Sequence, residues 1–173
     1  MKTKTTLLFL LIIFITGIST VTSCKKEEQA EGIDRQLYDM AKVSTGFTWY
    51  KNTDVQLPKS SGSGHTPPLL RTRYNAVAAA SLDSTGKVAA GASFAEGSLV
   101  VKELYADATT LERYAILYKQ AANENADANG WVWGYINADG TVSTSAVDKG
   151  AICTGCHSQA GSIDYMLMNK FFP

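Results

Sequence analysis

Short runs of Leu, Val, Ile, Tyr and Trp alternate with turn residues through the middle of the chain, a pattern that predicts β-strands. The expected strands span residues 69–75, 98–106, 111–119 and 131–137. The dipeptide Asp139-Gly140 is typical of a hairpin tip and leads into Thr141-Val142. We therefore expect a chain built mainly from short strands.

Helical spacing of apolar residues is confined to short segments. The apolar residues of the first such segment are Ile33, Leu37, Met40 and Ala41. They predict an amphipathic helix over residues 32–44, and two more short helices are expected, at residues 76–82 and at the turn that enters Cys153. Residues 57–68 are rich in Pro, Gly and Ser and predict a loop, whose His65 is more typical of a solvent-facing side chain than of a metal ligand.

The first 23 residues have the features of an export signal. Two lysines precede an apolar run over residues 7–18, and Cys24 follows where a cleavage site would fall. This pattern predicts a lipoprotein signal peptide over residues 1–23, a lipid on Cys24, and a solvated tether over residues 24–32 before a single domain at 33–173. An ordinary secretory signal with an unrelated cysteine is the alternative. We expect the protein to be exported and lipid-anchored in the periplasm or at the outer membrane.

The charge balance bears on the class of partner. The chain has 16 Lys and Arg against 16 Asp and Glu, and removal of a signal that contains Lys2 and Lys4 leaves 14 against 16. A net charge near −2 predicts no nucleic-acid partner. The 45% of hydrophobic residues are ordinary for a globular domain.

The strongest chemical signal is the run Cys153-Thr154-Gly155-Cys156-His157. Its two thiols lie about one helical turn apart, which suits two thioether bonds to one covalent haem c, and the adjacent His157 would ligate the iron. With Cys24 assigned to a lipid, no cysteine is left for a disulfide. A zinc site would need a further ligand, for which only His65 and carboxylates are available. A thioredoxin-type pair would need a parallel α/β pattern, which the sequence lacks.

The position of the motif narrows the kind of cytochrome. Only 16 residues follow His157, which excludes a small electron carrier with an N-terminal haem motif. A four-helix cytochrome also has its motif near the C-terminus, but it needs long helical periodicity where this chain has short strands.

Four stretches of the sequence add a more specific pattern. They are residues 93–104 (Ser-Phe-Ala-Glu-Gly-Ser-Leu-Val-Val-Lys-Glu-Leu), residues 71–75, Lys119 with Trp131 twelve positions later, and the tail from Ile163-Asp164-Tyr165 to Phe171-Phe172-Pro173. Together they resemble the cytochrome P-460 family, which includes the cytochromes c-prime-beta. The resemblance implies a mainly β (α+β) fold, an antiparallel sheet with a few helices, and a C-terminal haem c attachment motif. It also implies a gas-accessible distal face, a small gaseous or nitrogen-oxide ligand, a redox partner protein and, as in many members, a homodimer.

Lys102 is the residue at which, by this resemblance, the branches of the family separate. Hydroxylamine-oxidising members join the matching Lys to the haem, and gas-binding members do not. On a strand, Val100, Lys102 and Leu104 share one face, so the ammonium would lie between apolar neighbours, where burial favours the neutral amine. The alternative is a Lys whose stem packs while its head reaches water.

Two further positions follow from the resemblance. Arg71 matches the distal Arg, which would donate hydrogen bonds to bound NO, and Arg73 shares its strand face; a surface Arg is the alternative. Ala115 stands where hydroxylamine-oxidising members carry a catalytic Glu. Glu103 should face away from Lys102 and is therefore not an obvious substitute base.

The sequence therefore favours a haem protein that binds or redox-cycles NO or hydroxylamine over a competent hydroxylamine oxidase. The oxidase hypothesis predicts a haem–Lys102 bond and a distal base, whereas the binding hypothesis predicts apolar groups such as Phe94 over the iron. A simple electron-transfer cytochrome is the third hypothesis, and it needs a second protein ligand from His65 or a Met. Met166 and Met168 are more typical of core packing than of ligation.

Overall fold

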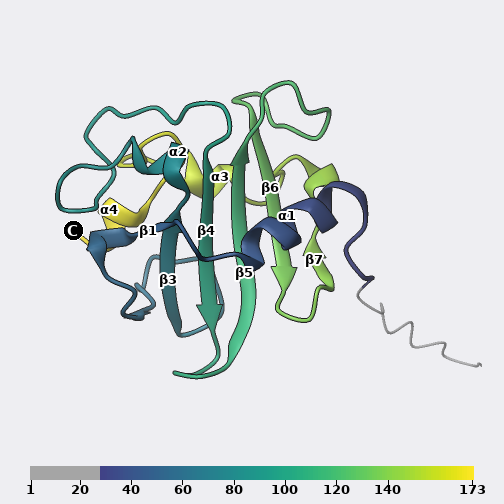
Figure 1. The fold of residues 1–173 in the computed structure, drawn as a ribbon, viewed down its shortest axis with the longest axis horizontal. Helices are drawn as coiled ribbons and strands as arrows, with labels where there is room; N and C mark the ends of the chain where they lie inside the picture. Colours follow the sequence, from purple (N-terminus) through teal and green to yellow (C-terminus); the bar gives the residue numbers. More distant parts are fainter. Residues whose placement is uncertain (1–27) are drawn as a thin grey trace, which may run out of the picture.

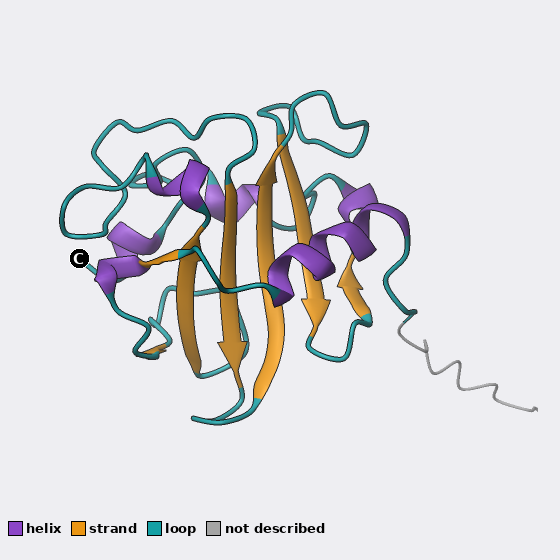
Figure 2. Cartoon of the chain, viewed as in Figure 1, coloured by secondary structure: helices purple, strands orange, loops and turns teal. Residues whose placement is uncertain are grey.

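One antiparallel sheet of seven strands organises the chain in this computed structural model, which describes residues 28–173 (Figures 1 and 2). The strands are β1 Thr48–Trp49, β2 Leu57–Pro58, β3 Leu69–Tyr74, β4 Leu99–Tyr105, β5 Leu111–Lys119, β6 Trp131–Asn137 and β7 Val142–Thr144. They lie in the order β1-β3-β4-β5-β6-β7, and β2 also pairs with β3. The expected mainly β fold with an antiparallel sheet and a few helices is confirmed.

The helices of the described residues are short. They are α1 Gly32–Lys42, α2 Ala76–Ala79, α3 Thr154–His157 and α4 Met168–Phe171, with 3-10 turns η1 Tyr50–Asn52 and η2 Ala146–Asp148. Within residues 28–173, no helix has both the length and the apolar character needed to cross a membrane. Strands β5 and β6 begin and end where the sequence predicts, whereas α1 ends two residues earlier than expected, at Lys42.

The first helix covers one face of the sheet, in front of β5 and β6 in Figure 1. Leu37 of α1 is fully buried there, and burial of a Leu side chain stabilises a fold by about 1.5–3 kcal/mol. A Cβ at Gly134 of β6 would come within 2.8 Å of the Leu37 side chain. The glycine therefore allows α1 to lie close to the sheet. Asp34 fixes the start of the helix by accepting hydrogen bonds from Ser145 and from the backbone of Ala146.

The C-terminal segments cover the opposite face of the sheet; α3 lies partly behind β4 in Figure 1, and Met168 of α4 contacts Thr72 of β3. A second core cluster fills this side; it includes Leu70, Val100, Leu104, Leu117, Trp131, Trp133 and Met168. Alternate residues of each strand belong to the two faces, as the pleat requires. Val100 and Leu104 of β4 lie on this second face, whereas Leu99 and Val101 pack beside α1.

The end of the expected tether belongs to the folded domain. Gln29 forms a β-bridge with Thr141, and the backbone N–H of Ala30 donates to the carbonyl of Gly140. Ala30 is buried. The last residues of the expected tether therefore pair through their backbone with the hairpin between β6 and β7.

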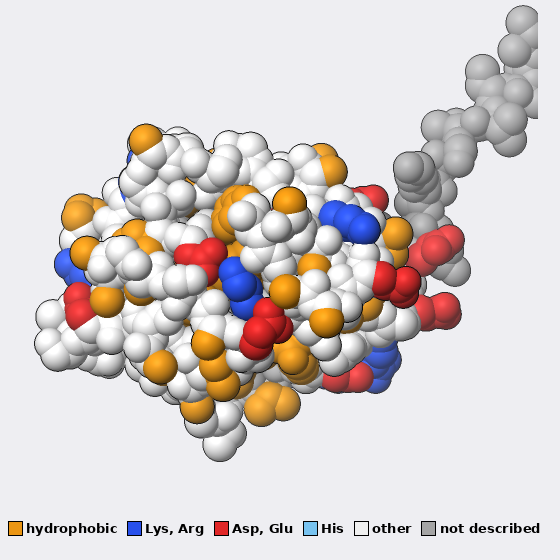
Figure 3. Space-filling model, turned by 90° about the horizontal axis from the view of Figure 1, so that it is seen from above, with side chains coloured by type: hydrophobic (Ala, Val, Ile, Leu, Met, Phe, Trp, Pro, Cys, Tyr) orange, Lys and Arg blue, Asp and Glu red, His pale blue; other side chains and the backbone are white. Residues whose placement is uncertain are grey.

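Export and lipid attachment concern residues 1–27, which lie outside the described part of the chain, as does Cys24. The surface view from above, toward the end of the molecule that carries α2 and the long loops, has acidic, basic and apolar side chains intermixed (Figure 3).

Candidate functional site

A cavity lies between the second face of the sheet and the C-terminal segments. One residue from each of five neighbouring strands forms its floor. In register order these residues are Thr72, Lys102, Ala115, Tyr135 and Thr144. We call them the floor row.

His157, at the end of α3, faces this cavity from the opposite side. Its Nδ1 lies 2.8 Å from the backbone carbonyl of Tyr165. A carbonyl can only accept a hydrogen bond, so Nδ1 carries a proton, and the neutral ring then has a free lone pair on Nε2. Burial lowers the pKa of His157 to about 4, which keeps the ring neutral at pH 7. This is the form and the outer hydrogen bond of a metal-ligating histidine.

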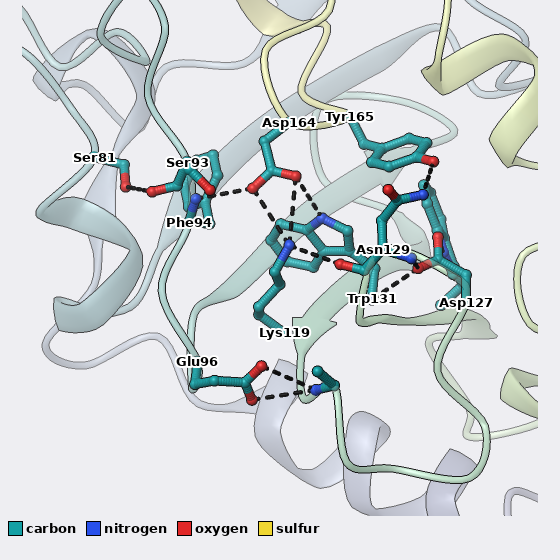
Figure 4. Close-up of polar contacts among 12 residues, drawn as sticks. Ser81, Ser93, Phe94, Glu96, Lys119, Asp127, Asn129, Trp131, Asp164 and Tyr165 are labelled. Carbon is teal, nitrogen blue, oxygen red and sulfur yellow. Dashed lines mark hydrogen bonds and ion pairs between the residues drawn. The ribbon is translucent and has the colours of Figure 1, made fainter.

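The Tyr165 carbonyl owes its position to a tight turn. Asp164 and Tyr165 both have positive φ angles, 42° and 69°, and the backbones of Ile163 and Met166 bond to each other across the turn. The Asp164 carboxylate accepts hydrogen bonds from the backbone N–H of Phe94 and from Trp131 Nε1, at 2.8 and 3.0 Å (Figure 4).

Lys119 reinforces this connection between the turn and the sheet. Its ammonium pairs with Asp164 at 3.5 Å and lies 4.7 Å from the centre of the Trp131 ring. Lys119, Trp131 and Asp164 come from two of the four stretches singled out in the sequence, and Figure 4 shows them in one contact group. The group holds the turn in place, and the turn orients His157.

Trp133 forms the wall beside His157. The two ring centres are 5.1 Å apart with the planes at 79°, and Trp133 Nε1 donates to Asp127. A Cβ at Gly150, whose φ is +68°, would come within 2.6 Å of the indole. A glycine is therefore needed for the chain that leads into Cys153 to lie against Trp133.

The two thiols of the motif lie at the mouth of the cavity. Cys153 lines both the main cavity and an adjoining outer cavity, and Cys156 lines the outer one. Both are free cysteines; burial raises the pKa of Cys153, and Cys156 is exposed. The two cavities share His65, Tyr135, Thr144, Cys153 and His157 as lining residues. The structure thus brings the two cysteines and the histidine of the motif to one opening.

Lys102 lies in the floor row, between Thr72 and Ala115. Burial lowers the pKa of its ammonium to about 8. Its neighbours on β4, Val100 and Leu104, are buried on the same face, as the strand alternation predicts, and Glu103 points to the other side. Among the described residues that line either cavity there is no carboxylate, and Ala115 occupies the centre of the floor.

Arg71 lies on the face of the sheet that is turned away from the cavity. Its Nε donates to Glu103 at 2.5 Å, and its guanidinium lies 4.5 Å from the centre of the Trp49 ring. Arg73 pairs with the same carboxylate. Because Thr72 points into the cavity, its two neighbours on β3 must point away. The structure therefore does not bring Arg71 or Arg73 to the site where a distal Arg was expected.

His65 is placed differently from the solvent-facing side chain that the sequence favours. It is half-buried, it lines both cavities, and its Nδ1 lies 3.4 Å from the hydroxyl of Tyr135. A further cation close to Tyr135 is one that the sequence did not single out. It is Arg113, whose guanidinium lies 4.7 Å from the centre of the Tyr135 ring.

Three apolar candidates are buried. Phe94 packs between Tyr74 and Trp131 and is absent from the cavity lining. Met166 and Met168 line the cavity but are only 5% and 3% exposed, and Met168 accepts a hydrogen bond from Thr72 through its sulfur. Both methionines therefore contribute to the core, as expected.

Residues 28–173 contain no group of three or more His, Cys, Asp and Glu side chains that could hold a metal ion. A haem iron does not need such a group, because the macrocycle supplies most of its ligands and the protein supplies only axial ones. Comparison of the sequence with known protein families and with curated proteins finds no match.

Proposed function

We propose that this protein is an exported, lipid-anchored cytochrome with one covalent haem c, similar to the cytochrome P-460 family, that binds, oxidises or reduces small nitrogen ligands such as NO or hydroxylamine. The observation that carries the proposal is the arrangement of Cys153, Cys156 and His157 at the mouth of a mostly apolar cavity. The free Nε2 of His157 is oriented there by the Tyr165 carbonyl.

The residues present fit a haem. Two free thiols and an imidazole whose Nδ1 already has its hydrogen-bond partner line the two adjoining cavities. Bound there, the haem would supply an iron centre able to bind a diatomic ligand or exchange electrons. His157 would hold that iron, the sheet face would exclude water from it, and Asp164 would keep the proximal turn rigid.

Binding is favoured over hydroxylamine oxidation within this proposal. Oxidation needs a base that removes protons from the bound substrate, and a base must lie within hydrogen-bond reach. The floor row offers Ala115 at its centre, with Lys102 on one side and Tyr135 on the other. Lys102 could act only in its neutral form, which becomes the majority above about pH 8.

The first experiment is the intact mass and absorption spectrum of the denatured protein, purified from a host that attaches haem c. The proposal predicts one haem that survives denaturation in the wild type. A Cys153→Ser, Cys156→Ser double variant should lose it, and Ser158→Ala is the matched control beside the motif. A wild type without covalent haem would refute the proposal.

A simple electron-transfer cytochrome is the second candidate function. The observation that favours it is the position of His65, which faces the cavity opposite the motif. Both candidate functions include a redox partner protein. The resemblance to the cytochrome P-460 family also leads us to expect a homodimer.

Localisation is tested separately, because it concerns residues 1–24. Cys24→Ser should release the protein from the membrane fraction if the cysteine carries the lipid. Unchanged membrane association of the variant would refute lipidation and leave the haem proposal intact.

A further inference from the structure

The imidazoles of His65 and His157 lie close together, and both line the cavity. Their ring centres lie 6.3 Å apart, and the ring planes are at 74°. Two metal–nitrogen bonds of about 2 Å, with roughly 1 Å from each nitrogen to its ring centre, place the centres of two ligating imidazoles about 6 Å apart. The pair therefore already has the separation of two axial ligands of one metal ion.

The outer nitrogen of each ring already has a partner. His157 Nδ1 donates to the Tyr165 carbonyl, and His65 Nδ1 lies 3.4 Å from the Tyr135 hydroxyl. In both rings Nε2 is left for another partner. Metal-ligating histidines usually have such an outer hydrogen bond, which fixes the ring and its tautomer.

The loop that carries His65 is tied at its base and packed at its tip. The backbone N–H of Lys59 donates to the carbonyl of Pro68 at 2.7 Å, which closes the loop. Gly62 lies against the Phe171 ring, where a Cβ would come within 2.6 Å. These contacts hold the loop over the cavity, while the imidazole itself has only the long contact with Tyr135 as its side-chain hydrogen bond in the described residues.

We propose that His65 is the second axial ligand of the iron in the resting protein, and that an external ligand must displace it. The inference rests on the proposed function, since it needs a haem at His157. It deepens that function, because the loop of residues 59–68 would then control access to the iron. Displacement would need the loop tip to leave its contact between Gly62 and Phe171, while the base of the loop stays paired in β2 and β3.

The test is the ferric absorption and electron paramagnetic resonance spectrum of the holoprotein, with the covalent haem content measured on the same samples. Wild type should be six-coordinate and low-spin. His65→Ala should be high-spin, and added imidazole should restore the low-spin spectrum. Lys59→Ala, in the same loop, is the matched control and should behave as wild type.

Ligand entry gives a second readout. CO should bind ferrous His65→Ala at least about tenfold faster than wild type, because only the fraction of iron without His65 can accept it. A high-spin wild type, or a low-spin His65→Ala variant, would overturn the proposal even if every sample contains covalent haem. Absence of covalent haem would instead refute the proposed function, so the two failures are distinguishable.

Discussion

Glu103 is a buried carboxylate whose removal should destabilise the sheet on the face away from the cavity. It is 4% exposed and accepts hydrogen bonds from Arg71 Nε and Tyr105 Oη, both at 2.5 Å. It also pairs with Arg73, which is 1% exposed and donates to the carbonyl of Ala41 in α1. The cluster thus connects β3, β4 and the end of the first helix.

Glu103→Gln keeps the shape of the side chain but leaves the Arg73 guanidinium buried without its counter-ion. Breaking a buried ion pair by removing one partner costs about 3–5 kcal/mol, a large part of the roughly 5–15 kcal/mol that stabilises a typical domain. For a domain of this size, each 1 kcal/mol lowers the Tm by about 2–4 °C, so a fall of roughly 6–20 °C is expected.

The assay is urea unfolding followed by tryptophan fluorescence, with thermal unfolding as a second measure. Asp39→Asn is the matched control; it removes the partner of Arg35 and Lys42 in an exposed group and should unfold at the wild-type midpoint. The double variant Arg73→Met, Glu103→Leu should recover much of the loss, because it removes both charges. A Glu103→Gln midpoint equal to that of wild type would refute the argument.

Three further variants test the site. Burial lowers the pKa of Lys102 to about 8 from 10.5, so keeping the charged form buried should cost about 3 kcal/mol of folding stability at pH 7. Haem-free Lys102→Met should therefore resist urea better than wild type at pH 7, and this difference should shrink as the pH rises from 8 to 10.5. A difference in stability that does not change with pH would contradict the argument. Gly150→Ala should lower the free energy of unfolding by about 2 kcal/mol through its clash with Trp133, and unchanged urea unfolding would argue against that contact. Asp164→Ala removes acceptors of two hydrogen bonds, one from Trp131, and should cost about 2–4 kcal/mol; a Tm within 2 °C of wild type would contradict it.

The strands were predictable because their signal is local. Residues 111–119 and 131–137 are continuous runs of β-forming side chains between clear turns, and the structure has both strands at those bounds. The same alternation correctly placed Lys102 and Glu103 on opposite faces of β4. Local pattern thus predicted which side of each strand a residue occupies.

Relations between strands were harder to predict. Arg71 was expected at the site, but the pairing of Thr72 with Lys102 turns it to the other face, and no local signal defines that register. The sequence favoured a solvent-facing His65, whereas the structure has it in the cavity lining. A loop rich in Gly and Pro has no periodicity that indicates its path. Asp164 was recognised only as part of a resemblance; its role depends on hydrogen bonds to residues 33 and 70 positions away.

The floor row allows the chemistry of the pocket to be altered by single substitutions. Its five residues come from five different strands and pair in register across the sheet. A single substitution therefore changes the pocket floor without changing the backbone hydrogen bonds between the strands. Ala115 is the smallest of the five and lies directly opposite Lys102 on the neighbouring strand. The Cβ atoms of two residues paired in this way are about 5 Å apart. A carboxylate introduced at position 115 would lie beside the Lys102 amine. One substitution would then add a proton-accepting group to a pocket floor that has no carboxylate.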